Sequence, residues 1–157
     1  SILLQTAQAQ TISIKKASGP IKLDGILDEA DWQNADKANN FQQYFPADGI
    51  PANSQSEIRL TYDEHFIYIG AKMYNLTNNR KYVTPSLRRD FRGEANDGIT
   101  LVFDTFKDRT NAFMFGLNPF GVQREGLISN GGRNGDDLSL NWDNKWFSEA
   151  KTYEGYW

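Results

Sequence analysis

The feature that most constrains the fold of this chain is a pair of neighbouring segments, Glu57 to Tyr62 and Phe66 to Met73, that fit the two strands of one β-hairpin. Apolar and polar residues alternate along the first segment, which places Ile58, Leu60 and Tyr62 on one face and Glu57, Arg59 and Thr61 on the other. Asp63-Glu64-His65 supplies residues that favour a turn. The second segment is almost wholly apolar, which predicts a strand covered on both faces.

Three more segments have the composition of strands, and short connections separate them: residues 98–103 (GITLVF), 111–117 (NAFMFGL) and 121–128 (GVQREGLI). Connections this short predict antiparallel neighbours. Thr11 to Lys16 also alternates, and Ile21 to Leu23 continues that edge. Because helical periodicity is scarce, the pattern is typical of an all-β, antiparallel sandwich.

One short helix is expected near the N-terminus, after the turn at Asp24-Gly25. Asp28 is a plausible N-cap because its carboxylate can accept the free amides of the first turn, and Trp32 would point into the core. Two long polar stretches are predicted to be loops. Residues 39–56 would be pinned by Phe41, Tyr44 and Phe45, whereas residues 75–96 form a basic excursion over the surface.

Composition excludes several functional classes. The 157 residues suggest one domain, and 17 basic against 20 acidic side chains give a net charge of -3, so affinity for nucleic acid or anionic lipid has no electrostatic basis. The absence of cysteine rules out disulfides and thiolate metal sites. His65 is the single histidine and lies in a predicted turn, which leaves little material for a histidine metal cluster or a catalytic triad.

The chain ends suggest a piece of a longer precursor. Residues 1–9 (SILLQTAQA) are interpreted as the remnant of a signal peptide, because Ala7-Gln8-Ala9 has the small-x-small pattern that export peptidases cut after; a disordered N-terminus is the alternative. The domain would span residues 10–157 and be truncated in a strand at its C-terminal EGYW. No run approaches the ~20 apolar residues of a membrane-spanning helix.

Four segments carry a resemblance to a known family: residues 21–32 (IKLDGILDEADW), residues 59–73 (RLTYDEHFIYIGAKM), residues 88–123, and WDNKW with the later EGYW. Their order and spacing resemble family 9 carbohydrate-binding modules and the related DOMON-like domains. More narrowly, they are similar to the version at the front of large outer-membrane-associated proteins of Gram-negative bacteria. The resemblance implies a jelly-roll-type β-sandwich that is exported to the periplasm, outer membrane or cell exterior, binds oligo- or polysaccharide and catalyses nothing.

A sugar site needs flat aromatic rings beside hydrogen-bonding side chains, since sugars present apolar C–H faces and hydroxyl edges. If residues 142–146 are extended, Trp142 and Trp146 share a face and lie roughly 13 Å apart. The polar half of the site would come from Arg88, Arg89, Asp90, Asn141 and Asn144. Two alternatives stay open: the indoles fill the core, and the arginines and Asp90 pair with one another on a solvated loop.

Calcium is the one cofactor that the resemblance implies. Asp97, Asp104 and Asp108, with Asn111, bracket the predicted strand at residues 98–103 and offer the oxygen ligands that Ca²⁺ prefers. The same residues could instead form turns without any ion.

Two functions from different classes follow. The first is a non-catalytic sugar-binding module, because neighbouring acids do not by themselves provide the two carboxylates about 5 to 9 Å apart that a glycosidase needs. The second is a docking domain that packs against an outer-membrane barrel or another protein and binds no glycan. Open indoles at Trp142 and Trp146 would favour sugar, whereas buried indoles and a broad apolar patch elsewhere would favour docking.

Overall fold

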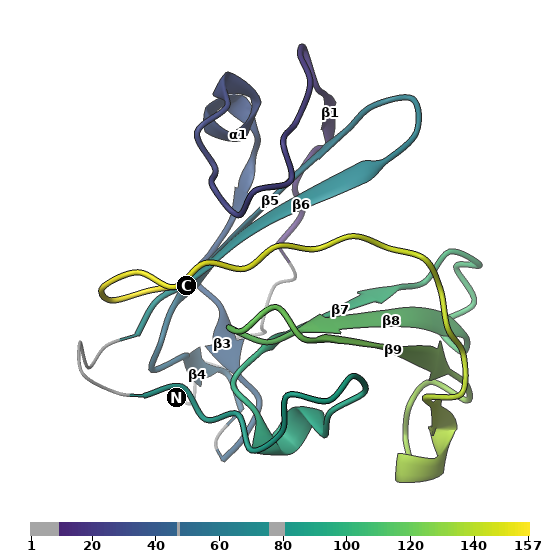
Figure 1. The fold of residues 1–157 in the computed structure, drawn as a ribbon. Helices are drawn as coiled ribbons and strands as arrows, with labels where there is room; N and C mark the ends of the chain where they lie inside the picture. Colours follow the sequence, from purple (N-terminus) through teal and green to yellow (C-terminus); the bar gives the residue numbers. More distant parts are fainter. Residues whose placement is uncertain (1–9, 47, 76–80) are drawn as a thin grey trace, which may run out of the picture. The chain divides into compact units, whose positions relative to one another are not determined.

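The computed structural model describes residues 10–46, 48–75 and 81–157, which form mostly strands, few helices and several antiparallel sheets (Figure 1). The expected all-β class is confirmed. The chain divides into two compact units, a first unit of residues 10–22, 26–75 and 153–157 and a second of residues 23–25 and 81–152. The predicted signal-peptide remnant lies outside the described residues.

The sheet of the first unit is built on the predicted hairpin. Strands β5 (Ser56–Tyr62) and β6 (Ile67–Met73) pair antiparallel, with Leu60 opposite Ile69, so the predicted alternation of faces is confirmed. On the other side of β5 lie two short strands, β1 (Lys15–Lys16), which runs parallel to it, and β2 (Lys37–Ala38), which runs antiparallel.

The remaining predictions for these strands need correction. The strand expected over residues 11–16 shrinks to the two residues of β1, and residues 21–23 are not a strand. Phe66 and Ile67 are 51% and 59% exposed, so the start of the second hairpin segment is not covered on both faces. Apolar composition predicted the strand correctly but not its burial, because burial depends on what packs against the strand.

Helix α1 (Ala30–Asn34) occupies the expected place, and Trp32 is buried as predicted. Its N-cap is Glu29 rather than Asp28, and no side chain caps the first turn. The Glu29 carboxylate instead accepts the amide of Lys22 at 2.9 Å. The helix lies close to β6 at Gly70, where a Cβ would stand 3.1 Å from Cζ3 of Trp32. It would also stand 2.9 Å from the Leu27 side chain, so a larger residue at position 70 would require Leu27 or the indole to shift.

The loop prediction for residues 39–56 was wrong about its aromatic residues. Strands β3 (Gln42–Gln43) and β4 (Ile50–Pro51) form a separate two-stranded sheet, and the rings beyond it point into solvent. Tyr44 and Phe45 are 87% and 82% exposed. A pairing of two residues joins the ends of this loop, and the described rings Tyr44 and Phe45 beyond it stay exposed.

The C-terminal residues of the first unit pair with the end of β6. The backbones of Met73 and Trp157 exchange hydrogen bonds of 2.8 and 3.1 Å, and Tyr74 forms an isolated bridge with Tyr156. The strand expected at the C-terminal EGYW is therefore present only as bridges. Trp157 is buried.

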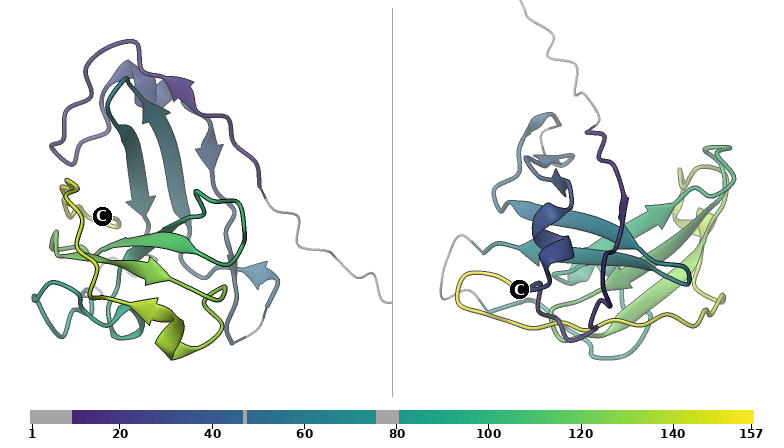
Figure 2. Two further views of the ribbon diagram at one scale, coloured as in Figure 1. Left: turned by 90° about the vertical axis from the view of Figure 1, so that its right-hand side faces the viewer. Right: turned by 90° about the horizontal axis from the view of Figure 1, so that it is seen from above.

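The second unit contains a four-stranded antiparallel sheet in the order β10-β9-β8-β7 (Figure 2). The three predicted strands are confirmed, and the elements are η1 (Gly93–Ala95), β7 (Ile99–Phe103), β8 (Ala112–Leu117), β9 (Gln123–Ile128), η2 (Gly135–Asp137) and β10 (Leu138–Ser139). Leu101 lies opposite Phe115, and Phe115 opposite Glu125, so these three side chains share one face.

Candidate functional site

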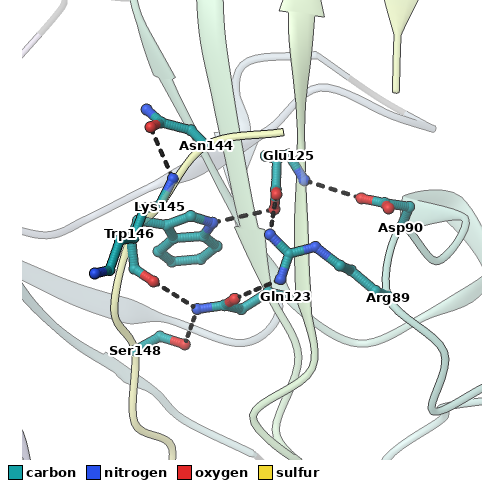
Figure 3. Close-up of polar contacts among 8 residues, drawn as sticks. All are labelled: Arg89, Asp90, Gln123, Glu125, Asn144, Lys145, Trp146 and Ser148. Atoms are coloured by element: carbon teal, nitrogen blue, oxygen red, sulfur yellow. Dashed lines mark hydrogen bonds and ion pairs between the residues drawn. The ribbon is translucent and has the colours of Figure 1, made fainter. Parts of the chain in front are cut away.

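The centre of the candidate site is Glu125 on β9, whose side chain is completely buried. Both of its carboxylate oxygens have partners: the Arg89 guanidinium forms an ion pair with Oε1, and the Trp146 indole Nε1–H donates to Oε2 at 3.1 Å (Figure 3). A carboxylate removed from water is stable only when it is paired and hydrogen-bonded in this way. Glu125 therefore anchors two segments that are distant in the sequence.

The first of these segments is the loop that carries Arg89 and Asp90. The Asp90 amide donates to the Gln123 carbonyl at 3.1 Å, and the Glu125 amide donates to Asp90 Oδ1 at 3.3 Å. Asp90 has a φ of 60°, a left-handed conformation that Asp tolerates better than most residues. The Arg89 Nη1 also donates to the side-chain oxygen of Gln123 at 2.8 Å. Backbone and side chains together thus fix this loop beside β9.

The second segment is the extended stretch that follows β10. The Gln123 side-chain amide donates to the carbonyl of Trp146 at 3.3 Å and to the Ser148 hydroxyl at 3.0 Å (Figure 3). Gln123 therefore links the arginine loop to the tryptophan segment, because its oxygen accepts from one and its nitrogen donates to the other.

Two tryptophans of this segment pack on aromatic side chains of β8. The Trp142 ring lies 5.0 Å from Phe113 and 5.9 Å from Phe115, and the Trp146 ring lies 5.4 Å from Phe115 at 71°. Both indoles are half-buried. Part of each ring thus packs on the sheet, and the rest is open to solvent. The indoles are therefore neither fully exposed nor part of a closed core.

The structure brings together three of the seven residues that the sequence predicts for a sugar site, namely Arg89, Asp90 and Trp146. Trp142 joins them through the shared contact with Phe115. The other three, Arg88, Asn141 and Asn144, are exposed, and Asn144 accepts the Lys145 amide at 2.8 Å.

Sequence reasoning missed Gln123 and Glu125, which hold the site together. A signal for them exists in the alternation of the predicted strands. With β8 and β9 paired antiparallel, Glu125 faces the aromatic side of the sheet, directly opposite Phe115. A carboxylate on such a face requires a cationic or hydrogen-bonding partner, and Arg89 was already a candidate.

The acidic residues proposed for calcium do not meet at one point. Asp97 accepts the Val83 amide at 2.7 Å before β7, whereas Asp104 accepts the Arg109 amide at 3.0 Å after it. Seven residues of extended chain separate these two carboxylates by about 23 Å. Asp97 therefore cannot share an ion with Asp104.

Asp108 has the hydrogen bonds of a turn former. Its carboxylate accepts the amides of Thr110 and Asn111 at 2.7 and 2.8 Å, and the Asn111 side chain at 2.8 Å. These donors, the Asn111 amide foremost, lower the pKa of Asp108 from its usual value. No group of three or more His, Asp or Glu side chains suited to a metal ion occurs within the described part of the chain. Calcium at Asp104 and Asp108 stays a prediction.

Comparison with protein-family models, with curated proteins and with solved structures gives no significant match for this chain. None of the helices in residues 10–46, 48–75 and 81–157 has the length and apolar character needed to cross a bilayer.

Proposed function

We propose that this chain is a non-catalytic carbohydrate-binding domain of an exported bacterial protein. The observation that carries the proposal is the convergence of Arg89, Asp90 and Trp146 on the buried Glu125, with Trp142 beside them. They come from three segments that lie far apart in the sequence, and they combine the two chemistries that a sugar requires, aromatic surface and paired hydrogen-bond donors and acceptors.

The arrangement is suited to hold its binding groups in place before a ligand arrives. The hydrogen bond from Trp146 to Glu125 fixes the orientation of the indole, so that little side-chain entropy is lost when a sugar ring stacks on its open part. The Arg89 side chain is 44% exposed, and a guanidinium has five N–H donors. Those not engaged by Glu125 and Gln123 can donate to sugar hydroxyls.

Catalysis at this site is not part of the proposal. Hydrolysis of a glycosidic bond needs an acid and a second carboxylate that both reach the substrate from the walls of a cleft. Glu125 is completely buried and both its oxygens are engaged by Arg89 and Trp146, so it cannot approach a glycosidic oxygen. Its role here is to position the binding residues.

The wider proposal follows the resemblance to family 9 modules. It comprises a jelly-roll-type sandwich, export through a signal peptide to the periplasm or outer membrane, and a calcium ion held by Asp104 and Asp108 as a structural element. The sheets and the two tryptophans support the sugar-binding part, and the export and calcium parts rest on sequence features.

A fluorescence titration tests the function directly. Trp32 and Trp157 are buried, at 3% and 8% exposure, so a ligand that changes tryptophan emission acts on the half-buried pair Trp142 and Trp146. We expect one or more members of an oligosaccharide panel to change the emission, and Trp142→Ala to weaken that binding about tenfold or more, equivalent to about 1.4 kcal/mol.

Phe120→Ala is the matched control, because Phe120 is a 55% exposed aromatic residue outside the site. It should leave sugar affinity unchanged, and far-UV circular dichroism should show that both variants fold. A complete lack of response across a broad panel by the folded parent chain would overturn the proposal.

The second candidate function is a docking domain for an outer-membrane barrel or another protein, and a separate observation favours it. The β3–β4 loop presents Tyr44 and Phe45 almost fully to solvent, beside the partly exposed Phe41 and Ile50. Exposed apolar residues gathered in this way often mark an interaction surface.

Cosedimentation with purified outer membranes distinguishes this candidate. A docking domain should bind the membranes in the absence of sugar and lose binding when Tyr44→Ser is combined with Phe45→Ser, whereas Trp142→Ala should bind like the parent. No cosedimentation of the parent chain would rule out docking on outer membranes.

A further inference from the structure

The edge strands of the two four-stranded sheets differ in how they are protected from pairing with other strands. Exposed sheet edges attract other strands unless they are short, charged, interrupted or covered. In the first unit, β1 and β2 have two residues each, and β6 carries Lys72 and Gly70 and is bonded to Trp157 at its end. In the second unit, β10 has two residues.

Strand β7 is longer than these short edge strands, is not interrupted and carries no charge. Its five residues, ITLVF, include no charged residue, proline or glycine, and within the described residues β8 is the strand that pairs with it. Thr100 and Val102 are exposed, Val102 at 57%. Alternate residues of an edge strand direct their N–H and C=O groups away from the single neighbour. Such a row of backbone donors and acceptors is complementary to another extended strand.

We infer that β7 is a pairing surface for β7 of a second copy of this chain, joined antiparallel about a two-fold axis at Leu101. In this register Leu101 lies opposite itself, Ile99 opposite Phe103, and Thr100 opposite Val102. Every one of these cross-strand pairs is uncharged, and Asp104 would face Gly98 rather than another carboxylate. The strand is therefore complementary to itself, as an isologous interface requires.

The register also preserves the two faces of the sheet. Ile99, Leu101 and Phe103 lie on the face that carries Phe115 and Glu125, and directly opposed residues of antiparallel strands share a face. The paired sheets would thus continue the apolar row of β7 across the two-fold axis and keep the exposed Thr100 and Val102 together on the other side. Val83 bonds to Asp97, two residues before β7, and leaves the five pairing residues unaffected.

Disulfide trapping tests the register, because the natural chain has no cysteine. Directly opposed residues have Cα atoms ~4.5–5.5 Å apart, within the range of a disulfide, whereas an offset of two residues separates them by more than ~7 Å. We expect Thr100→Cys chains mixed with Val102→Cys chains to form covalent dimers under mild oxidation, and either variant alone to form far fewer. Both positions are exposed, so the substitutions spare the core.

Sedimentation velocity over a wide concentration range tests the association itself. We expect a reversible dimer whose dissociation constant rises about tenfold or more in Val102→Lys, since this places charges on an otherwise uncharged pairing edge, a feature that protects natural edge strands from association. Phe120→Lys is the control, because it introduces the same charge at a similarly exposed apolar residue, and it should dimerise like the parent. A monomer at every concentration, or equal crosslinking in the mixed and single samples, would overturn the inference.

Discussion

The sheets of the two units each use one charged side chain on a strand to hold a segment that is not part of the sheet. In the first unit, Arg59 on β5 donates from Nη1 to the carbonyls of Trp32 and Ala35, at 2.8 and 3.4 Å, at the end of α1. In the second unit, Glu125 on β9 holds Arg89 and Trp146.

The difference lies in burial and in the kind of partner. The Arg59 side chain keeps 21% exposure and bonds mainly to neutral carbonyls that the end of a helix leaves unsatisfied, with Glu57 at 3.8 Å. Glu125 has no exposure and depends on a cation. Loss of Arg59 in the first unit leaves neutral carbonyls of the buried residues Trp32 and Ala35 without a donor, whereas loss of Arg89 in the second leaves a buried charge without its cation, which costs more. Similar geometry therefore implies unequal sensitivity to mutation.

The largest effect is expected for Arg89→Met, which removes the cation from Glu125 and keeps most of the side-chain volume. Breaking a buried ion pair costs several kcal/mol, and because Arg89 is partly exposed we expect a loss of about 3 kcal/mol in the free energy of unfolding. Urea denaturation measures this change.

Two controls sharpen this result. Arg88→Met alters an exposed neighbour and should change stability by no more than about 0.5 kcal/mol. Adding Glu125→Leu to Arg89→Met should recover part of the loss, because the buried charge is gone. A double variant less stable than the single one would show that Glu125 is not destabilised by losing Arg89.

A smaller effect is expected for Arg59→Met in the first unit. The lost hydrogen bonds go to carbonyls at the end of α1, so the free energy of unfolding should fall by about 1–2 kcal/mol. Lys16→Met is the matched control, since its ion pair with Glu64 is exposed and should contribute less than about 0.5 kcal/mol. If Arg59→Met proves as destabilising as Arg89→Met, the expected difference in sensitivity between the Arg59 and Glu125 contacts is wrong.

The smallest effect on stability is expected at two similar turns, in which the carboxylates of Asp63 after β5 and Asp108 after β7 accept backbone amides. The Tyr68 hydroxyl, followed by the amides of His65 and Phe66, lowers the pKa of Asp63 from its usual value. A carboxyl whose pKa is lower in the folded state adds stability above its unfolded pKa of about 3.9, and this stability is lost as the pH falls through the folded pKa. We expect acid to weaken the turn accordingly.

Substitution at Tyr68 separates the two turns. Tyr68→Phe removes the first donor of Asp63, so NMR titration of the carboxyl groups should show its pKa moving up toward the usual value. The pKa of Asp108 depends on Asn111 and Thr110 and should stay where it was. A parallel shift of both groups would mean that the change acts through the whole fold rather than through one hydroxyl.

The sequence was sufficient for elements whose contacts are local. The β5–β6 hairpin and strands β7 to β9 follow from alternation and short connections, because a close turn fixes both direction and register. The two-residue strands β1 and β2 could not be found in this way, since they exist only through pairing with the distant β5.

The candidate site was predictable in its outer residues and not in its centre. Arg89, Asp90 and Trp146 stood out by residue type, as donors, acceptors and aromatic surface. Glu125 looks like an ordinary charged residue of a strand, and its burial depends on residues 36 positions earlier and 21 positions later in the chain. Periodicity reports which face a side chain takes, but not which distant segment covers that face.

The close approach of Trp32 to Gly70 means that the residue sizes tolerated at these two positions depend on each other. A methyl group at position 70 would meet the indole at 3.1 Å and the Leu27 side chain at 2.9 Å. In chains that share this hairpin and helix, a larger residue at position 70 should therefore accompany a smaller side chain at position 32 or 27, so that covariation among these three positions would identify relatives that overall identity misses.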